Sequence, residues 1–145
     1  MLRQELFDRV DILRKDSPAE RIRNMRDLLE EAGDEAQKIR HLPDWAAKEM
    51  VNAGLYRFAL PTALAGEDLL ARDQIEAVEA ASAIDGSVGW CVQINSEINA
   101  LMIRQMNKEL AEKICGDWDV LVCSGQGTPN GPNPGREASL EGSDW

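Results

Sequence analysis

Basic residues are scarce in this chain. Lysine and arginine together number 16, against 26 aspartates and glutamates, and the formal net charge is −10 at pH 7. Nucleic acids and anionic membrane surfaces both attract proteins through clusters of basic side chains. We therefore expect neither a nucleic acid nor a membrane among the partners of this protein.

Long apolar segments are also missing. No apolar run approaches the roughly 20 residues that a membrane-spanning helix needs. The N-terminal stretch MLRQELFDRVDILRK places charges between its apolar positions and lacks the apolar core of a signal peptide. We therefore expect a cytoplasmic protein.

Sequence patterns typical of metal sites and catalytic centres are absent as well. The cysteines Cys91, Cys115 and Cys123 form no CxxC pair and have no histidine nearby, which argues against a disulfide framework or a structural zinc site. The chain holds no GxxxxGK, no HExxH and no nucleophile elbow. The only histidine, His41, has no neighbouring serine or cysteine and predicts no triad. The residues alone identify no catalytic group and no metal ligand.

What the sequence does contain is a helical pattern organised around residues 79–102. An alanine-rich stretch ends at residues 85–87, Asp-Gly-Ser, where side-chain oxygens and a glycine suit the start of a helix. After this break, apolar side chains recur at the spacing of one helix face: Cys91, Ile94, Ile98 and Leu101. Apolar residues off that stripe, such as Val88 and Trp90, predict a central helix that is contacted from several sides.

Periodicity predicts further helices on either side of this segment. They cover residues 2–13, 17–36, 43–53, 70–84 and 107–116. In the stretch 70–84 the apolar stripe consists of Ile75, Val78, Ala81 and Ile84, and neighbouring alanines allow close helix packing. Ser17 and Glu20 are spaced for a capping box, and Gly54 suits a left-handed helix end. Residues 56–61 are expected to form an extended apolar connection.

The character of the chain changes near its C-terminus. Residues 120–123 form a short β-prone run, and residues 124–135, SGQGTPNGPNPG, are too rich in Gly, Pro and Asn for a regular element. A single strand has no sheet to join here, so the sequence predicts a truncated chain. We expect a mainly α helical domain over residues 1–117, followed by the first strand and loop of an incomplete β-domain over residues 118–145.

Two features of this pattern leave a functional and a structural interpretation open. Asn95, Ser96 and Asn99 place polar groups on the central helix. Either they face a ligand cavity or, as we favour, Ser96 and Glu97 mark a solvent edge and the asparagines bond to neighbouring backbone. The small residues of the loop 124–135 either let backbone N–H groups approach a ligand or form a simple linker.

Three segments together resemble the acyl-CoA dehydrogenase superfamily. LPDWAAKEMVNAGLYRFALPTALAGEDL (residues 42–69) is similar to its N-terminal helical domain, where Ala-Gly-Leu leads to a proline and a Gly-Gly-type turn. IEAVEAASAIDGSVGWCV (75–92) resembles the next helix pair, with Asp-Gly-Ser-x-Gly-Trp between. VCSGQGTPNGPNPGREA (122–138) is similar to the strand and loop that begin the middle β-domain. The Asp-Gly-Ser-x-Gly-Trp form most resembles the flavin-dependent monooxygenase branch.

This resemblance implies a function. It implies the N-terminal part of a two-component monooxygenase that hydroxylates an aromatic or polycyclic small molecule with reduced FAD or FMN from a partner flavin reductase. The parent protein would be a homo-oligomer, a tetramer. By position in the pattern, Trp90 would line the substrate or flavin pocket, and Ser124 and Thr128 would approach the flavin. The alternatives are oxidation of an acyl thioester by an acyl-CoA dehydrogenase, or a non-catalytic helical interaction module exposing apolar surface around Trp118 and Leu121.

The chain also departs from the family pattern. Ala65 stands where the family has its second turn glycine, and the closing Gly-x-Trp is only approximated by residues 142–145. The remaining β-domain and the C-terminal helical bundle have no counterpart in these 145 residues. The family's catalytic base therefore cannot be assigned to any position here, and we expect this chain alone to be inactive.

Overall fold

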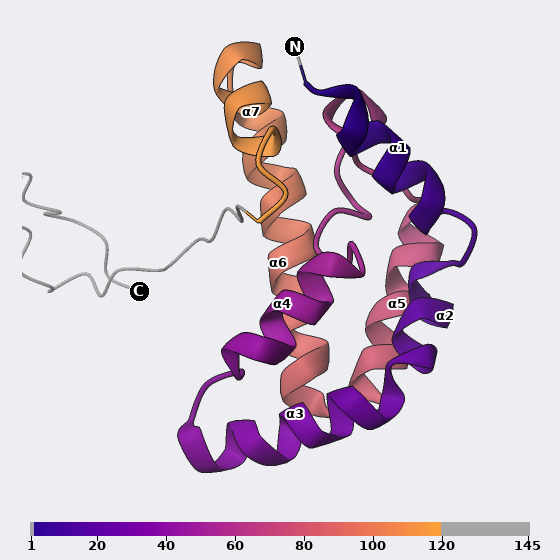
Figure 1. Ribbon diagram of the computed structural model, residues 1–145, viewed down its shortest axis with the longest axis vertical. Helices are drawn as coiled ribbons and strands as arrows, with labels where there is room; N and C mark the ends of the chain where they lie inside the picture. The colour runs from indigo at the N-terminus through magenta and orange to yellow at the C-terminus, as the bar shows by residue number, and fades with distance from the viewer. Residues whose placement is uncertain (1, 120–145) are drawn as a thin grey trace, which may run out of the picture.

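Helices form the regular structure of the computed structural model, which describes residues 2–119 (Figure 1). In chain order they are α1 (Gln4–Leu13), α2 (Pro18–Asn24), α3 (Arg26–Ile39), α4 (Asp44–Asn52), the short 3-10 helix η1 (Thr62–Leu64), α5 (Ala71–Ser82), α6 (Gly86–Gln105) and α7 (Lys108–Cys115). No strand occurs among residues 2–119. The mainly α prediction is confirmed for this part of the chain, whereas the predicted strand at 120–123 and loop at 124–135 lie outside the described residues.

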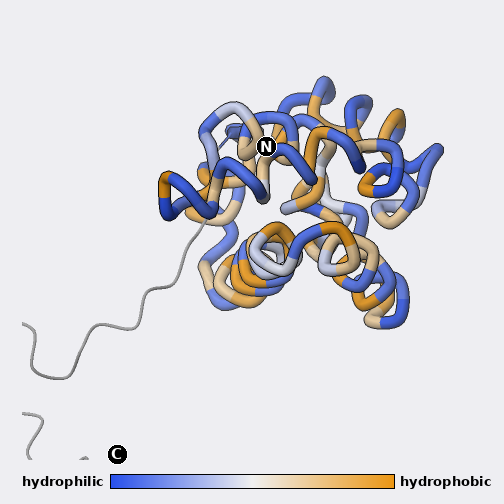
Figure 2. The backbone as a smooth tube through the Cα atoms, turned by 90° about the horizontal axis from the view of Figure 1, so that it is seen from below, coloured by the Kyte–Doolittle hydropathy of each residue, from blue (hydrophilic) through white to orange (hydrophobic). Residues whose placement is uncertain are grey.

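The helices are arranged in two layers. In Figure 1, α5 and α6 lie side by side behind α1 to α4, and the view from below in Figure 2 separates the same two layers. The short helix α2 packs on α5, while α3 packs on α6. Within residues 2–119, no helix combines the length and the apolar character needed to cross a membrane.

The segment between α4 and η1 supplies much of the core. Leu55, Phe58 and Leu60 are almost completely buried there. The predicted extended connection at residues 56–61 is wrong, because this segment is a series of turns. Gly54, at φ +69°, reverses the chain after α4, and the N–H of Leu55 donates to the carbonyl of Met50 at 3.1 Å. This helix end folds the apolar side chains inward rather than along an extended strand.

The predicted helix over residues 17–36 is two helices. Its start is confirmed: the Ser17 hydroxyl accepts from the N–H of Glu20, whose carboxylate accepts from the N–H of Ser17 in a complete capping box. The chain then bends at Met25, at φ −97° and ψ 12°. The bend lets α2 pack on α5 and α3 pack on α6, so tertiary packing overrides a continuous helical pattern.

The predicted apolar stripes of α5 and α6 are only partly buried: Ala81 lies in the core, and Val78, Ile84 and Cys91 pack against it. Ile75 on α5 is 66% exposed and Leu101 on α6 is 50% exposed. The buried faces consist mainly of small or polar residues: Ala77, Ala80 and Ala81 on α5, and Val88, Gly89, Val92, Ser96, Asn99, Ala100 and Ile103 on α6. The close approach that the alanines predicted is confirmed. The helices α5 and α6 pack through the faces that carry small side chains, so larger apolar residues stay outside this contact.

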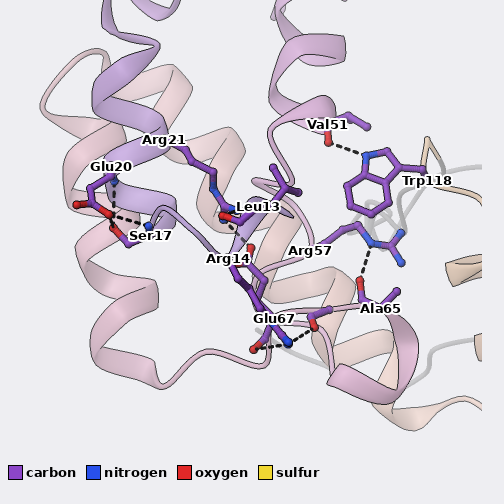
Figure 3. Close-up of polar contacts among 11 residues, drawn as sticks. Leu13, Arg14, Ser17, Glu20, Arg21, Val51, Arg57, Ala65, Glu67 and Trp118 are labelled. Carbon is purple, nitrogen blue, oxygen red and sulfur yellow. Dashed lines mark hydrogen bonds and ion pairs between the residues drawn. The ribbon is translucent and has the colours of Figure 1, made fainter. Parts of the chain in front are cut away.

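Trp118 joins the helical unit to the end of the described chain. Its indole N–H donates to the carbonyl of Val51 at 2.9 Å (Figure 3). The guanidinium groups of Arg9 and Arg57 lie 4.0 and 4.7 Å from its ring centroid. Trp118 is only 7% exposed. The hypothesis of an exposed interaction surface at Trp118 is therefore wrong, while Leu121 lies outside the described residues.

A carboxylate holds the start of α6. Asp85 accepts hydrogen bonds from the N–H groups of Ser87 and Val88, at 2.8 and 3.1 Å, and from the Ser87 hydroxyl. The hydroxyl bond, followed by the backbone bonds, lowers the pKa of Asp85 below its ordinary 3.8. This is the cap that the Asp-Gly-Ser break predicted.

Replacing this cap has an expected cost that depends on pH. We expect Asp85→Ala to lower the free energy of unfolding by about 0.5–2 kcal/mol at pH 7. Because the folded-state pKa is depressed, the stabilisation is present above pH 3.8 and is lost as the pH falls through the folded-state value. Urea unfolding at neutral and acidic pH measures both effects. Asp85→Asn keeps the cap and should match the wild type at pH 7, and an equal loss in both variants would contradict the cap.

Candidate functional site

A surface hollow lies where the C-terminal end of α3 and the α3–α4 loop meet the first turns of α6. Its volume is about 490 Å³, within the range of small-molecule sites. We call it the Trp90 hollow, and its polar and aromatic lining consists of Gln37, Arg40 and His41 on one side and Ser87, Trp90 and Cys91 on the other.

The fold explains most of the Asp-Gly-Ser-x-Gly-Trp segment but not its tryptophan. Asp85 caps α6, and a Cβ on Gly89 would lie 2.1 Å from the Ser82 hydroxyl and 2.7 Å from the Ser82 Cα. Gly89 is therefore the residue that allows α5 and α6 to touch. Trp90 is 63% exposed, with its side chain at the hollow. Burial does not account for a large aromatic residue at this position, and its indole lies open at the hollow.

Arg40 stands out among the arginines of the described chain. Its guanidinium makes no ion pair or hydrogen bond within residues 2–119, whereas every other arginine there has a polar partner. Arg40 also ends α3 in the left-handed conformation, at φ +68° and ψ 20°, where glycine is the usual residue. The sequence thus keeps a long cationic side chain at a backbone position that disfavours it.

Some of the other polar groups of the hollow already form hydrogen bonds within the fold. His41 Nδ1 lies 3.0 Å from the carbonyl of Leu42, an arrangement that requires Nδ1 to carry the proton and leaves Nε2 for another partner. The Ser87 hydroxyl donates to Asp85, so it can only accept from a ligand. Burial, and secondarily the Asp85 charge, raise the pKa of the Cys91 thiol above 9.0. This thiol stays protonated near neutral pH and is a poor nucleophile.

The strain at Arg40 gives a direct prediction. We expect Arg40→Gly to raise the free energy of unfolding by about 0.5–1 kcal/mol, because glycine adopts the left-handed conformation without a Cβ clash. Arg40→Ala removes the same charge but keeps the strain, so it serves as the matched control. Thermal unfolding of both variants compares them, and a loss of stability in Arg40→Gly would show that the arginine side chain stabilises the fold.

A second hollow of about 440 Å³ lies between α5 and α6, with Phe58 and Ser96 in its lining. Of the three polar residues predicted on α6, only Ser96 lines this hollow, and all three make hydrogen bonds to backbone carbonyls. Asn95 donates to the carbonyl of Cys91 at 2.8 Å, and Asn99 donates to the carbonyl of Tyr56 at 3.2 Å. The Ser96 hydroxyl donates to the carbonyl of Val92 at 2.7 Å. The predicted solvent edge is confirmed at Glu97, which is exposed, and is wrong at Ser96, which is buried.

The two residues predicted to approach a flavin, Ser124 and Thr128, lie outside the described part of the chain. Within residues 2–119 no cluster of histidine, cysteine, aspartate and glutamate is arranged to hold a metal ion. The Trp90 hollow is open, with Arg40, His41 and Trp90 all exposed. These residues do not enclose an isoalloxazine ring, and we derive no flavin-dependent step from them.

The sequence therefore located one member of the hollow, Trp90, and missed its charged side. Arg40 and Gln37 reach the hollow only because α3 packs across α6, and periodicity carries no signal for that contact. The absence of glycine at the end of α3 was the one available hint. Compared with models of known protein families, with curated proteins and with solved structures, the chain gives no match in any of the three.

Proposed function

We propose that this chain forms the N-terminal helical part of a flavin-dependent oxidoreductase, a two-component monooxygenase that acts on an aromatic or polycyclic small molecule. The observation that carries the proposal is the exposure of Trp90. In a segment where the capping aspartate and the packed glycine serve the fold, the tryptophan is exposed and lines a hollow of ligand size together with Ser87. A flat aromatic side chain in such a place suits stacking against another ring.

The turn between η1 and α5 supports the same proposal. Ala65 adopts the left-handed conformation at φ +53°, at the position where the resemblance expects a glycine. A Cβ on Gly66 would lie 2.1 Å from the carbonyl oxygen of Leu60, so only glycine fits there. The backbone of residues 65 and 66 thus has the conformational demands of a glycine pair, even though one glycine is replaced.

The roles in this proposal are divided between the cofactor and the chain. Reduced FMN or FAD would supply the oxygen chemistry and a separate flavin reductase would regenerate it. The described residues would bind and orient the substrate, with Trp90 as the flat wall of its pocket. Ser124 and Thr128 are the proposed flavin contacts, and the parent protein is proposed to be a cytoplasmic tetramer.

Turnover tests this proposal in the protein as the cell makes it. The chromosomal gene receives a tag at its 5′ end, and the purified product is mixed with a flavin reductase, NADH, FMN or FAD, and naphthalene derivatives. Oxygenated products detected by mass spectrometry, and reduced in Trp90→Ala, are the expected result. Anaerobic oxidation of an acyl thioester with an artificial electron acceptor would favour the dehydrogenase alternative instead. No turnover in either assay would contradict the proposal.

One observation favours a second candidate, a non-catalytic interaction module. The outer face of α6 carries Leu101, 50% exposed, together with the half-buried Ile94 and Ile98. Helices that are apolar on more than one side are usually covered on more than one side. Light scattering of the 145-residue chain tests this candidate: self-association that Leu101→Lys removes would favour it, and a monomer at all concentrations would count against it.

A further inference from the structure

We propose that the Trp90 hollow binds a planar aromatic carboxylate, with the Trp90 indole against the ring and the Arg40 guanidinium on the carboxylate. The inference rests on the proposed function in one respect, since it takes this hollow as the substrate end of the protein. The binding itself requires no flavin. The proposed ligand is an aromatic ring that bears an acid group. Neutral polycyclic compounds are excluded as the preferred occupants.

Arg40 supplies a positive charge at the hollow. With a net charge of −10, the protein repels anions in general, so an anion site must be made by local cations. Arg40 is such a cation, because it lines the hollow and has no partner in the described chain, unlike the other arginines. A guanidinium presents a planar fork of N–H donors that matches the two oxygens of a carboxylate. Asp85, the N-cap of α6, accepts three hydrogen bonds on Oδ1 but keeps its negative charge, which Arg40 must outweigh at the hollow.

The size and the flat wall of the Trp90 hollow suit an aromatic ring. A hollow of about 490 Å³ accommodates a fused two-ring system. Trp90 offers one flat wall, and its exposed indole gains burial when a ring covers it. On the Arg40 side, His41 Nε2 can accept a hydrogen bond from a polar substituent, and the Gln37 amide can donate or accept one. The thiol of Cys91 stays protonated and adds no competing negative charge.

The backbone conformation of Arg40 is also unusual for an arginine. Arginine holds the left-handed position at the end of α3, where glycine costs less conformational strain. Residues kept in such conformations cluster at ligand sites. Removal of the Arg40 side chain is therefore expected to cost ligand affinity while the fold gains stability.

Binding of 2-naphthoate to the full 145-residue chain tests the inference. The indole N–H signals of the four tryptophans are recorded by NMR during the titration, and the Trp90 signal is assigned by its loss in Trp90→Leu. We expect 2-naphthoate to shift the Trp90 signal, and Arg40→Gly to weaken binding about tenfold or more, as loss of a charge-assisted pair implies. The melting temperature of Arg40→Gly should equal or exceed that of the wild type.

Matched controls test separately the position of the arginine and tryptophan, the charge of the ligand and its aromatic ring. Arg72→Gln removes one arginine from a fully exposed site on α5 and should leave the affinity unchanged. Trp45→Leu removes another half-exposed indole and should also leave it unchanged. The neutral 2-naphthamide should bind at least about tenfold more weakly than 2-naphthoate. Cyclohexanecarboxylate tests the ring and should bind weakly too.

Several outcomes would overturn the inference. It fails if 2-naphthoate leaves the Trp90 signal unmoved, if Arg40→Gly and Arg72→Gln bind alike, or if 2-naphthamide binds as well as the acid. If inorganic phosphate competes equally with 2-naphthoate, the hollow recognises negative charge alone. The proposed recognition of an aromatic ring would then be wrong. None of these measurements uses flavin. Naphthoate binding without turnover would overturn only the proposed function, and turnover of neutral compounds without naphthoate binding would overturn only this inference.

Discussion

Arg21→Met is expected to destabilise the fold by about 3–5 kcal/mol at pH 7. Arg21 and Glu67 form an ion pair at 2.5 Å, and their side chains are 7% and 3% exposed (Figure 3). Arg21 also donates to the carbonyl of Leu13 at 2.9 Å. The substitution leaves a buried carboxylate without its main partner. Chemical unfolding of the 145-residue chain measures the loss.

The pH dependence of this loss identifies its cause. Burial raises the pKa of Glu67 above its ordinary 4.5, and the hydrogen bond and charge of Arg21 oppose that rise. A raised folded-state pKa means that the contribution of Glu67 to stability is largest at low pH and is lost as the pH rises through the folded-state value. Without Arg21 the pKa of Glu67 rises further. The deficit of Arg21→Met should therefore shrink as the pH is lowered from 7 towards 4.5.

Two control variants bracket the result. Arg23→Met breaks a half-exposed pair with Glu76 at 3.3 Å and should cost no more than about 1 kcal/mol. The double variant Arg21→Met/Glu67→Leu removes both charges and should recover most of the stability. A loss in Arg21→Met that is as small as in Arg23→Met, or that does not change with pH, would contradict a buried charge pair.

Gly89→Ala is expected to destabilise the protein by about 1–3 kcal/mol, as overpacking of a close helix contact does. The added Cβ would lie 2.7 Å from the Cα of Ser82, which is backbone, so rotation of the Ser82 side chain cannot relieve the clash. The two helices α5 and α6 must move apart instead. Thermal or urea unfolding measures the loss.

Gly86 in the same segment supplies the control. A Cβ at this position meets nothing within 4 Å, and the residue begins α6. Gly86→Ala should therefore leave stability unchanged or raise it by up to about 1 kcal/mol, because alanine is the better helix former. Equal destabilisation by the two substitutions would show that the contact of α5 with α6 does not depend on a bare glycine backbone.

The local signals of the sequence predicted local structure well. The Ser17 capping box, the Asp85 cap and the left-handed Gly54 are each set by residues within one helical turn, and each is confirmed. Such features depend on hydrogen bonds between near neighbours, which spacing alone describes.

The choice of buried face could not be predicted in the same way. Ile75 and Leu101 fit an apolar stripe, but α5 and α6 meet through alanines and Gly89, which pack more closely than the larger residues allow. The bend at Met25 likewise depends on which helices α2 and α3 contact. For the site, Trp90 was found by resemblance, while Arg40 reaches the hollow through a tertiary contact that no motif records.

Flavin binding by the protein as the cell makes it tests the central claim most directly. The product of the gene tagged at its 5′ end is titrated anaerobically with reduced FMN and reduced FAD, with 2-naphthoate present and absent. The account predicts saturable binding of one reduced flavin and a further shift of the Trp90 indole signal when naphthoate is added. A protein that binds neither reduced flavin at any concentration tested would contradict the flavin-dependent function.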